Sequence, residues 1–525
     1  MRVLVSDPIS AKGIEILKKA GIEVDVKTGL KPEELKAIIG GYHGLIIRSA
    51  TKVTADIIET ATSLKVVGRA GSGLDNVDKA AATKKGIVVM NTPGGNTMTT
   101  AEHTVALMFA LARLIPQASA SMKQGMWEKK KFEGVELFNK TLGIIGLGNI
   151  GSQVAKKALG LEMNVIAFDP FLSEERARET GIERASLEDI WARADFISIH
   201  TPLTPETKNL INKKTIAMMK DGVRILNCAR GGIVNEKDLE EALTSGKVAG
   251  AALDVFEKEP PEDTSLCKLD RVVCTPHLGA ATKEAQENVA IAVAEQVSDY
   301  LVKGIIRNAV NFPSIPPEQL PLLSPYLKLA EKLGSFAAQV FEYGVKELTV
   351  EFRGKASEVN SAPITIAALK GFLTPILEET VNFVNAPFIA KERGIEVKET
   401  KSMDSGDYQS LLCIHLKARG KENYICGTVF GKKDPRIIRV DDFPVEIIPE
   451  GTMLFMFNND KPGVIGSIGS LLGARKINIA RMHFGREEAG GRAISVVNVD
   501  SPITADILEE IKGLPNILSV RLVEL

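Results

Sequence analysis

The sequence has few cysteines, no excess of either charge and no long hydrophobic run. No Cys-x-x-Cys spacing occurs, which argues against a disulfide framework or a zinc site and fits a reducing cytoplasm; the five cysteines are Cys228, Cys267, Cys274, Cys413 and Cys426. Because 65 Lys and Arg residues balance 66 Asp and Glu residues, no broad field attracts nucleic acid or an anionic membrane. No apolar run reaches the ~18 residues that cross a membrane, and no signal peptide is visible. We therefore expect a soluble, cytoplasmic protein that binds neither nucleic acid nor membranes.

The chain is too long for a single hydrophobic core. At 525 residues, 44% of them hydrophobic, it should form three or four domains. Apolar runs at 3–6, 45–48, 66–69 and 87–91 predict the strands of a small parallel α/β domain. Residues 99–114 predict a long, mostly apolar helix that is buried between domains.

A second series of strands begins at residue 141. Apolar runs separated by helical patterns predict a doubly wound sheet of six strands at 142–145, 165–168, 196–200, 224–227, 250–254 and 272–275. A single helix over 282–302 follows without another strand of this kind, so we expect the chain to return to the first domain. A Rossmann-type nucleotide domain (98–282) would then be inserted in a flavodoxin-like substrate-binding domain (1–97 and 283–311).

The rest of the chain is separated from this part by a proline-rich stretch. Residues 311–325 predict an extended linker, because proline fixes φ and removes a donor; the prolines are Pro313, Pro316, Pro317, Pro321 and Pro325. An α+β intervening domain (312–449) follows, in which no set of residues indicates a chemistry. Residues 452–525 have βαββαβ order, which predicts a ferredoxin-like module.

A glycine fingerprint predicts the cofactor site. Gly146, Gly148 and Gly151 directly follow an apolar strand and open a helix. In that position the glycines allow a tight turn, a close approach to a pyrophosphate and packing of the helix on the strand. Asp169 ends the next strand, where its carboxylate can accept hydrogen bonds from ribose hydroxyls and would repel a 2′-phosphate. The pattern therefore predicts NAD rather than NADP.

Three loops at the carboxyl end of the same sheet carry groups suited to oxidising an alcohol. Arg230, which two glycines follow, can hold a carboxylate, and the next two strands are followed by Glu259 and His277. An imidazole can take the hydroxyl proton, and a neighbouring carboxylate fixes its tautomer and raises its pKa. Taken singly, each residue also has an ordinary surface or capping explanation, but all three lie at one sheet edge. They are the candidate catalytic residues.

Arginines end two strands of the first domain as well. Arg48 and Arg69 both follow parallel strands, so they can converge in the domain cleft, where two arginines suit a phosphate. Backbone donors around Gly71 and Gly73, and the loop that carries Asn96, can face the same anion. Surface ion pairs are the alternative explanation for the two arginines.

These motifs resemble those of the D-isomer-specific 2-hydroxy-acid dehydrogenases, in the glycine fingerprint and in residues 227–232, 254–260 and 275–277. The resemblance implies that Arg230 binds the substrate carboxylate and that His277, supported by Glu259, is the acid/base. It implies that NAD is contacted by Ser72, Gly146, Gly148, Asn149, Ile150, Gly151, Asp169, Thr201, Cys228, Ala229, Arg230, Asp254, His277, Gly279 and Ala280.

The resemblance extends to the members of the family that act on 3-phosphoglycerate. It implies that Arg48, Arg69, Gly73 and Asn96 contact this substrate, and that the product is 3-phosphohydroxypyruvate, at the entry to L-serine synthesis. Residues 129–131, three lysines, are a solvated charge run or reach a neighbouring subunit's site. A glyoxylate or hydroxypyruvate reductase, and an NAD-sensing scaffold similar to the corepressors with this fold, are the alternatives.

The last residues resemble an ACT domain, a small-molecule sensor, in residues 459–466 and 476–480. The resemblance implies that Asn458 and Asp460, with Asn478 of a paired module, bind L-serine as an effector. Residues 324–449 are similar to the intervening domain of the long form, so the match covers essentially the whole chain. It implies a homotetramer built from dimers.

Overall fold

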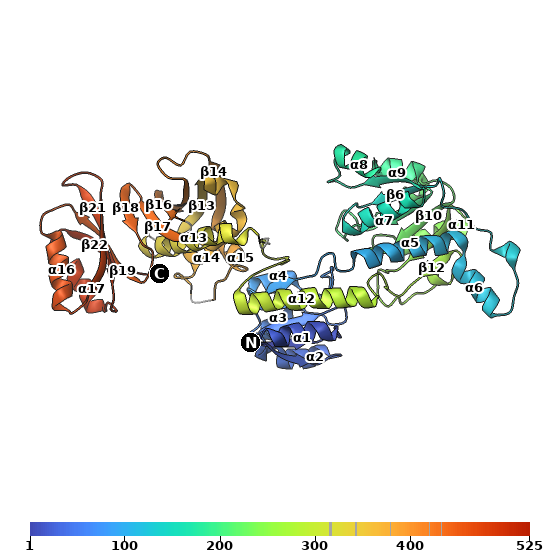
Figure 1. Ribbon diagram of the computed structural model, residues 1–525, viewed down its shortest axis with the longest axis horizontal. Helices are drawn as coiled ribbons and strands as arrows, with labels where there is room; N and C mark the ends of the chain where they lie inside the picture. The colour runs from blue at the N-terminus through green and yellow to red at the C-terminus, as the bar shows by residue number, and fades with distance from the viewer. Residues whose placement is uncertain (314, 316–317, 342–343, 378–379, 419, 432) are drawn as a thin grey trace.

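The computed structural model describes residues 1–313, 315, 318–341, 344–377, 380–418, 420–431 and 433–525, and contains four sheets (Figure 1). The first is a parallel sheet of order β2-β1-β3-β4-β5, formed by Arg2–Val5 (β1), Glu23–Val26 (β2), Gly44–Ile47 (β3), Val66–Arg69 (β4) and Val88–Met90 (β5). This is the flavodoxin-like order. The edge strand β2 was not predicted, because its Glu23 and Asp25 interrupt any apolar run.

Helices cover both faces of this sheet. One face packs on α1 (Ala11–Lys19) and α12 (Lys283–Lys303), and the other on α2 (Pro32–Ile38), α3 (Ala55–Thr60) and α4 (Lys79–Lys84). The prediction that the chain returns to the first domain is confirmed by α12, whose Val289, Val293 and Val297 are buried against β1, β3 and β4.

The helix that leaves the first domain begins two residues before the predicted one and ends one residue before its predicted end. It is α5 (Thr97–Arg113), and it ends where Leu114 adopts a left-handed conformation with φ 53°. Pro116 then lies in the first turn of α6 (Ile115–Lys123), where proline needs no amide donor. In the described chain no single helix is long and apolar enough to cross a membrane. Helices α5 and α6 reach that length and composition only together, and the pair is bent by 65°.

The second sheet is parallel, with order β12-β11-β10-β9-β6-β7-β8. Its strands are Thr141–Ile145 (β6), Asn164–Phe168 (β7), Glu183–Arg184 (β8), Phe196–Ile199 (β9), Val223–Asn227 (β10), Val248–Leu253 (β11) and Val272–Cys274 (β12). The six predicted strands are confirmed, and β8 is a short exposed edge strand that sequence patterning missed. The strand order reverses between β6 and β9, which is where open sheets of this class bind ligands.

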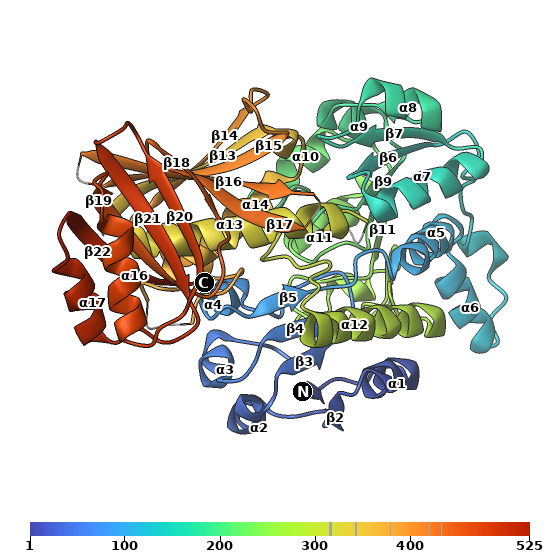
Figure 2. The same cartoon turned by 60° about the vertical axis from the view of Figure 1, so that its left-hand side comes forward.

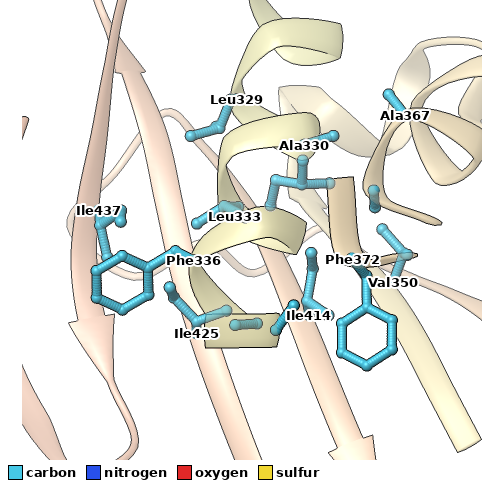
Figure 3. Close-up of a cluster of buried hydrophobic side chains, with 14 of the residues drawn as sticks. Leu329, Ala330, Leu333, Phe336, Val350, Ala367, Phe372, Ile414, Ile425 and Ile437 are labelled. Carbon is cyan, nitrogen blue, oxygen red and sulfur yellow. The ribbon is translucent and has the colours of Figure 1, made fainter. Parts of the chain in front are cut away.

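A six-stranded sheet forms the intervening region. Its order is β14-β13-β15-β16-β17-β18, from Val345–Gly354 (β13), Glu396–Ser402 (β14), Ser410–Ala418 (β15), Lys421–Phe430 (β16), Asp434–Val440 (β17) and Phe443–Ile447 (β18). One face packs on α13 (Leu320–Val340), α14 (Ser361–Leu373) and α15 (Ala386–Glu392). Figure 3 shows Leu333 and Phe336 of α13 against Ile414, Ile425 and Ile437 of this sheet.

The predicted linker over 311–325 is partly wrong, because α13 already begins at Leu320. Pro321 lies in its first turn, where the missing donor costs nothing, and Pro325 lies inside the helix. Pro316 and Pro317 lie outside the described residues. The helix forms despite its prolines because Leu323, Leu329 and Leu333 are buried in the shared core.

The last sheet has order β20-β21-β19-β22, the ferredoxin-like arrangement, from Thr452–Asn459 (β19), Ile479–Arg486 (β20), Arg492–Val499 (β21) and Ile517–Glu524 (β22). One face packs on α16 (Val464–Ala474) and α17 (Ala505–Lys512). The other face of this sheet lies beside the intervening region (Figure 2) and shares a core with it. In that core the rings of Phe336 and Phe455 meet edge to face, 5.5 Å apart. These two parts therefore pack as one unit.

The expectation that the cysteines form no disulfide is wrong. Cys413 on β15 and Cys426 on β16 are directly opposed in antiparallel register and are joined by a disulfide. The sequence gives no sign of this, because strand register brings the two residues together across a hairpin. Cys228, Cys267 and Cys274 are free. The cytoplasmic location inferred from cysteine usage accordingly stays a prediction.

Candidate active site

The glycine fingerprint forms the turn between β6 and α7 (Asn149–Gly160). Gly146 has φ 92°, and a Cβ atom there would lie 2.7 Å from the carbonyl oxygen of His200. A Cβ atom on Gly151 would collide with the Gly146 carbonyl, whereas Gly148 faces open space. The first residues of α7, Asn149 and Ile150, bring free backbone amides to that space. The turn fits a pyrophosphate.

Asp169 lies beside this turn at the end of β7. Its Oδ2 accepts a hydrogen bond from the Leu147 amide at 2.7 Å, and its Oδ1 accepts one from the Phe171 amide at 2.8 Å. A cavity of about 600 Å³ opens beside the carboxylate, with Phe168 and Pro170 also on its wall. Thr201, at the end of β9, has a buried hydroxyl oxygen without a partner in the described chain. Both observations fit a nucleotide with ribose hydroxyls.

His277 and Glu259 form a hydrogen-bonded pair. Nδ1 of His277 lies 2.6 Å from Oε2 of Glu259, and the other carboxylate oxygen accepts the Phe256 amide at 3.1 Å. His277 has φ 54°, a conformation that few non-glycine residues adopt. With Nδ1 committed to Glu259, Nε2 is the ring nitrogen left for a substrate.

The pair shifts both pKa values in the directions expected of an ion pair. The hydrogen bond that His277 donates to Glu259 raises the pKa of His277; burial and the charge of Arg230 oppose this rise without cancelling it. Burial works to raise the pKa of Glu259, but the hydrogen bonds from His277 and from the Phe256 amide, together with the charge of His277, outweigh it and the net pKa is lowered. Because an opposite charge favours imidazolium, the ring titrates above its ordinary value.

A buried carboxylate holds the loop that carries His277. Asp254, completely buried at the end of β11, accepts hydrogen bonds from the Thr275 hydroxyl at 2.6 Å, and from the amides of Leu278 at 2.6 Å and Gly279 at 2.8 Å. His103 on α5 places its Nε2 3.2 Å from the same carboxylate. The family resemblance predicts that Asp254 contacts the cofactor, but no motif in the sequence marks this scaffold or the part of His103 in it.

Arg230 reaches across the cleft to the first domain. Its Nε donates to Asp75 Oδ2 at 3.1 Å, and its Nη1 donates to the Ala229 carbonyl at 2.7 Å. The guanidinium lies over Gly73 so closely that a Cβ atom there would collide with it. Gly73, which is predicted to contact the substrate, therefore lies against Arg230, the residue predicted to bind the substrate carboxylate.

Arg69 and Arg48 belong to the same cluster. Burial lowers the pKa of Arg69 most, and the nearby charges of Arg230 and Arg48 lower it further. Asn76 bonds both the Arg69 guanidinium and the Arg48 carbonyl, and the adjacent Asp75 bonds Arg230. The Arg69 Nε donates to Asn76 Oδ1 at 3.2 Å, and the Arg48 Nη1 donates to the Pro8 carbonyl at 3.2 Å. The predicted convergence of the two strand-end arginines agrees with this geometry.

Ser72 and Asn96 join two loops at the edge of this cluster. The Ser72 hydroxyl donates to Asn96 Oδ1 at 2.8 Å, and Asn91 donates to the Ser72 carbonyl at 2.6 Å. Thr92 is buried and accepts the Gly71 amide at 2.8 Å. The loops after β4 and β5 are therefore held as one wall of the cleft.

Cys228 lies beneath this site and is buried, with Ala229 following it in the backbone. Burial raises the pKa of the Cys228 thiol to about 12, so the residue contributes no thiolate to the chemistry. Burial lowers the pKa of His200, at the end of β9, to about 4, so this ring stays neutral at physiological pH. Ala280 follows Gly279 in the loop that Asp254 holds.

The predicted effector residues are not brought together within one chain. Asn458 and Asp460 lie at the carboxyl end of β19, where Asn458 accepts the Ser495 hydroxyl at 2.8 Å. Asn478 precedes β20 at the opposite end of the sheet, where it donates to Asp500 at 2.6 Å. A site that contains all three residues therefore needs a second copy of the module.

Family models match three segments of the chain. Residues 105–279 match the NAD-binding domain of the D-isomer specific 2-hydroxyacid dehydrogenases. Residues 322–441 match the D-3-phosphoglycerate dehydrogenase intervening domain, and residues 452–516 match the ACT domain.

Relatives match over the whole length. The D-3-phosphoglycerate dehydrogenase of Archaeoglobus fulgidus is 47% identical over 100% of both chains. That of Synechocystis is 47% identical over 100% of this chain and 95% of its own, and that of Bacillus subtilis is 44% identical over 100% and 99%.

Solved structures are similar over a smaller share. A Thermus thermophilus protein is 38% identical, with a TM-score of 0.55 over 59% of this chain and 100% of its own. The D-lactate dehydrogenase of Aquifex aeolicus, solved with NAD and lactic acid, is 27% identical, with a TM-score of 0.53 over 60% and 100%.

Proposed function

The chain belongs to the D-3-phosphoglycerate dehydrogenases of the D-isomer-specific 2-hydroxyacid dehydrogenase family, and from this premise we propose a role for each residue of the cleft. It catalyses the NAD-dependent oxidation of 3-phosphoglycerate to 3-phosphohydroxypyruvate, which commits carbon to L-serine. When bound, NAD supplies the nicotinamide that accepts the hydride. The turn of Gly146, Gly148 and Gly151 would hold its pyrophosphate, and Asp169 its ribose.

In this proposal His277 is the acid/base. Its Nε2 takes the proton of the substrate's 2-hydroxyl during oxidation and returns it in the reverse direction. Glu259, 2.6 Å from Nδ1, fixes the tautomer and stabilises the imidazolium that forms. Asp254 holds the loop, so the ring is oriented before the substrate arrives.

We assign the two ends of the substrate to different arginines. Arg230 binds the carboxylate, beside the acid/base, while Arg48 and Arg69 bind the phosphate, with Asn96 and the backbone around Gly73 at the same wall. The pKa of Arg69 is lowered by burial and then by the charges of Arg230 and Arg48, which supports this assignment, because a cluster of like charges is stabilised by a multivalent anion.

The observation that carries the proposal is the pair of His277 and Glu259 beside the three arginines. An assay with 3-phosphoglycerate and NAD tests it, with removal of the phosphohydroxypyruvate to draw the reaction forward. We expect NADH formation in the native chain and none with His277→Ala. Near-native turnover of His277→Ala would refute the acid/base role, and preference for glycerate in the native chain would refute the phosphate assignment.

We also propose that L-serine regulates the enzyme and that the chain forms a tetramer. The positions of Asn458 and Asn478 at opposite ends of the sheet support a serine site formed by two paired modules. Repeating the assay with serine, and measuring the mass in solution, tests both. The domain boundaries proposed are 1–97 with 283–311, 98–282, 312–449 and 452–525.

A further inference from the structure

Adjacent residues of one loop hold the two arginines assigned to opposite ends of the substrate. Asp75 accepts the Nε of Arg230 at 3.1 Å, and Asn76 accepts the Nε of Arg69 at 3.2 Å. In each guanidinium the Nε edge is thereby occupied, which fixes the direction in which the terminal nitrogens point. Arg69 belongs to the first domain and Arg230 to the nucleotide-binding sheet, so this dipeptide relates the two sides of the cleft.

The dipeptide is itself rigidly held. Leu74 and Val77, on either side of it, are buried in the core of the first sheet. The Asn76 carbonyl accepts the Val53 amide at 2.8 Å. The Asn76 side-chain amide donates both hydrogens, to the carbonyl of Arg48 at 2.7 Å and to that of Thr51 at 2.6 Å.

This network also includes the second phosphate-binding arginine. Asp7 is buried after β1, where its carboxylate accepts the Arg48 amide at 2.6 Å and the Thr51 hydroxyl at 2.7 Å. Asn76 therefore joins the backbone that carries Arg48 to the guanidinium of Arg69. Asp75, in contrast, contacts the carboxylate clamp from the other domain.

We propose that Asp75 and Asn76 are positioning residues that determine substrate specificity. They fix the separation between the carboxylate clamp, which is Arg230, and the phosphate clamp, which is Arg48 and Arg69. A three-carbon acid with a terminal phosphate spans that separation, whereas a shorter or unphosphorylated acid binds one clamp only. This inference rests on the roles proposed above for Arg230 and Arg69.

Because each residue acts through a different arginine, their replacement should have different signatures. Asn76 acts through Arg69, so Asn76→Ala should impair only a phosphorylated substrate. Asp75 acts through Arg230, so Asp75→Ala should impair every 2-oxo acid that carries a carboxylate. Asp75→Asn retains an oxygen that can accept the Nε hydrogen of Arg230, so it should restore most of the loss.

The test compares phosphohydroxypyruvate with hydroxypyruvate in the reductive direction, with NADH. We expect Asn76→Ala to lower kcat/KM about tenfold or more for phosphohydroxypyruvate and to leave hydroxypyruvate within about twofold, the effect of a lost hydrogen bond to a charged group. Asp75→Ala should lower both values by a similar factor. An equal loss on both substrates with Asn76→Ala, or equal damage from Asp75→Ala and Asp75→Asn, would overturn the proposal.

Two further variants keep the result interpretable. Asn76→Gln keeps an amide with one acceptor and two donors but places it one methylene further out, so it should displace the Arg69 guanidinium and impair phosphohydroxypyruvate alone even if Asn76→Ala does not fold. Asp56→Ala removes another exposed aspartate of the same domain, 3.9 Å from Lys36, and should change neither value. Loss of selectivity there would also contradict the proposal.

Arg69→Ala and Arg230→Ala separate this inference from the proposed function. If Arg69→Ala leaves the preference for phosphohydroxypyruvate unchanged, the phosphate assignment itself fails. If Arg69→Ala removes that preference while Asn76→Ala does not, the assignment stands and the positioning role of Asn76 is wrong. If Arg230→Ala impairs both substrates while Asp75→Ala does not, the carboxylate assignment stands and the positioning role of Asp75 is wrong.

Discussion

Asn382 of the intervening region donates its side-chain amide to the carbonyl of Gly86 in the first domain, at 2.8 Å. Gly86 has φ 74°, and a Cβ atom there would collide with the same amide. Two further contacts lie nearby: an ion pair of Lys84 with Glu392 at 3.7 Å, and an edge-to-face contact of Phe312 with Phe383 at 6.0 Å. These contacts attach the intervening region to the first parallel sheet.

We therefore predict that Gly86→Ala loosens this attachment. Gly21 provides the matched control, because it has φ 76° with open space around the position of a Cβ atom. Gly21→Ala should cost only the strain of a left-handed alanine, about 1–2 kcal/mol. Gly86→Ala should cost more and should speed proteolysis of the chain. Equal melting temperatures and equal cleavage rates for the two variants would contradict the prediction.

A second prediction concerns the pH dependence of oxidation. His277 must be neutral to accept a proton, and Glu259 raises the pKa of His277 by stabilising its charged form. Glu259→Gln removes the charge, so the pKa should fall and the acid limb of kcat/KM should move to lower pH. The stability contributed by the ion pair is present below the ordinary histidine pKa and is lost as pH rises through the raised one.

The control for this experiment is a similar pair outside the cleft. Nε2 of His415 lies 3.0 Å from Glu351 in the intervening sheet. Glu351→Gln should leave the acid limb where it is. If the limb stays in place with Glu259→Gln, or moves equally with Glu351→Gln, His277 is not the group that the profile reports.

The third prediction concerns the disulfide between Cys413 and Cys426. It closes a loop with a sequence separation of 13, for which loop-closure entropy gives about 3 kcal/mol of stabilisation. Reduction with dithiothreitol should lower the free energy of unfolding of the native chain and leave a Cys413→Ala/Cys426→Ala variant unchanged. Thiol counting should give three free groups before reduction. Five free groups in the untreated native chain would show that the bond is absent in solution.

The sequence was most informative where side chains follow parallel strands. Carboxyl ends of such strands share one edge of a sheet, so spacing alone predicted that Arg230, Glu259 and His277 lie together. It was least informative where contacts depend on strand register or on ordinary loop residues. The disulfide and the two arginine-holding residues, Asp75 and Asn76, are of this kind, and no motif marks either.

Edge strands and the proline-containing helix were missed for a related reason. Strands β2 and β8 are largely exposed and lack the apolar runs by which buried strands are recognised. Helix α13 contains Pro321 and Pro325, which locally disfavour a helix, but burial of its leucines outweighs that preference. In both cases tertiary packing, rather than local composition, determines the element.

The last prediction concerns the choice of cofactor. Asp169 has two roles in the structure: its carboxylate holds the Leu147 amide of the glycine turn, and it faces the space expected for the ribose. Asp169→Asn keeps an oxygen for the Leu147 amide but removes the charge that repels a 2′-phosphate. We expect kcat/KM for NADP to rise relative to NAD by about tenfold, which corresponds to ~1.4 kcal/mol. The measurement compares both cofactors at saturating 3-phosphoglycerate.

Glu174→Gln is the control, because Glu174 lines the same cavity and pairs with Arg178 at 3.3 Å. An unchanged ratio with Asp169→Asn, or the same change with Glu174→Gln, would show that this carboxylate does not select the cofactor.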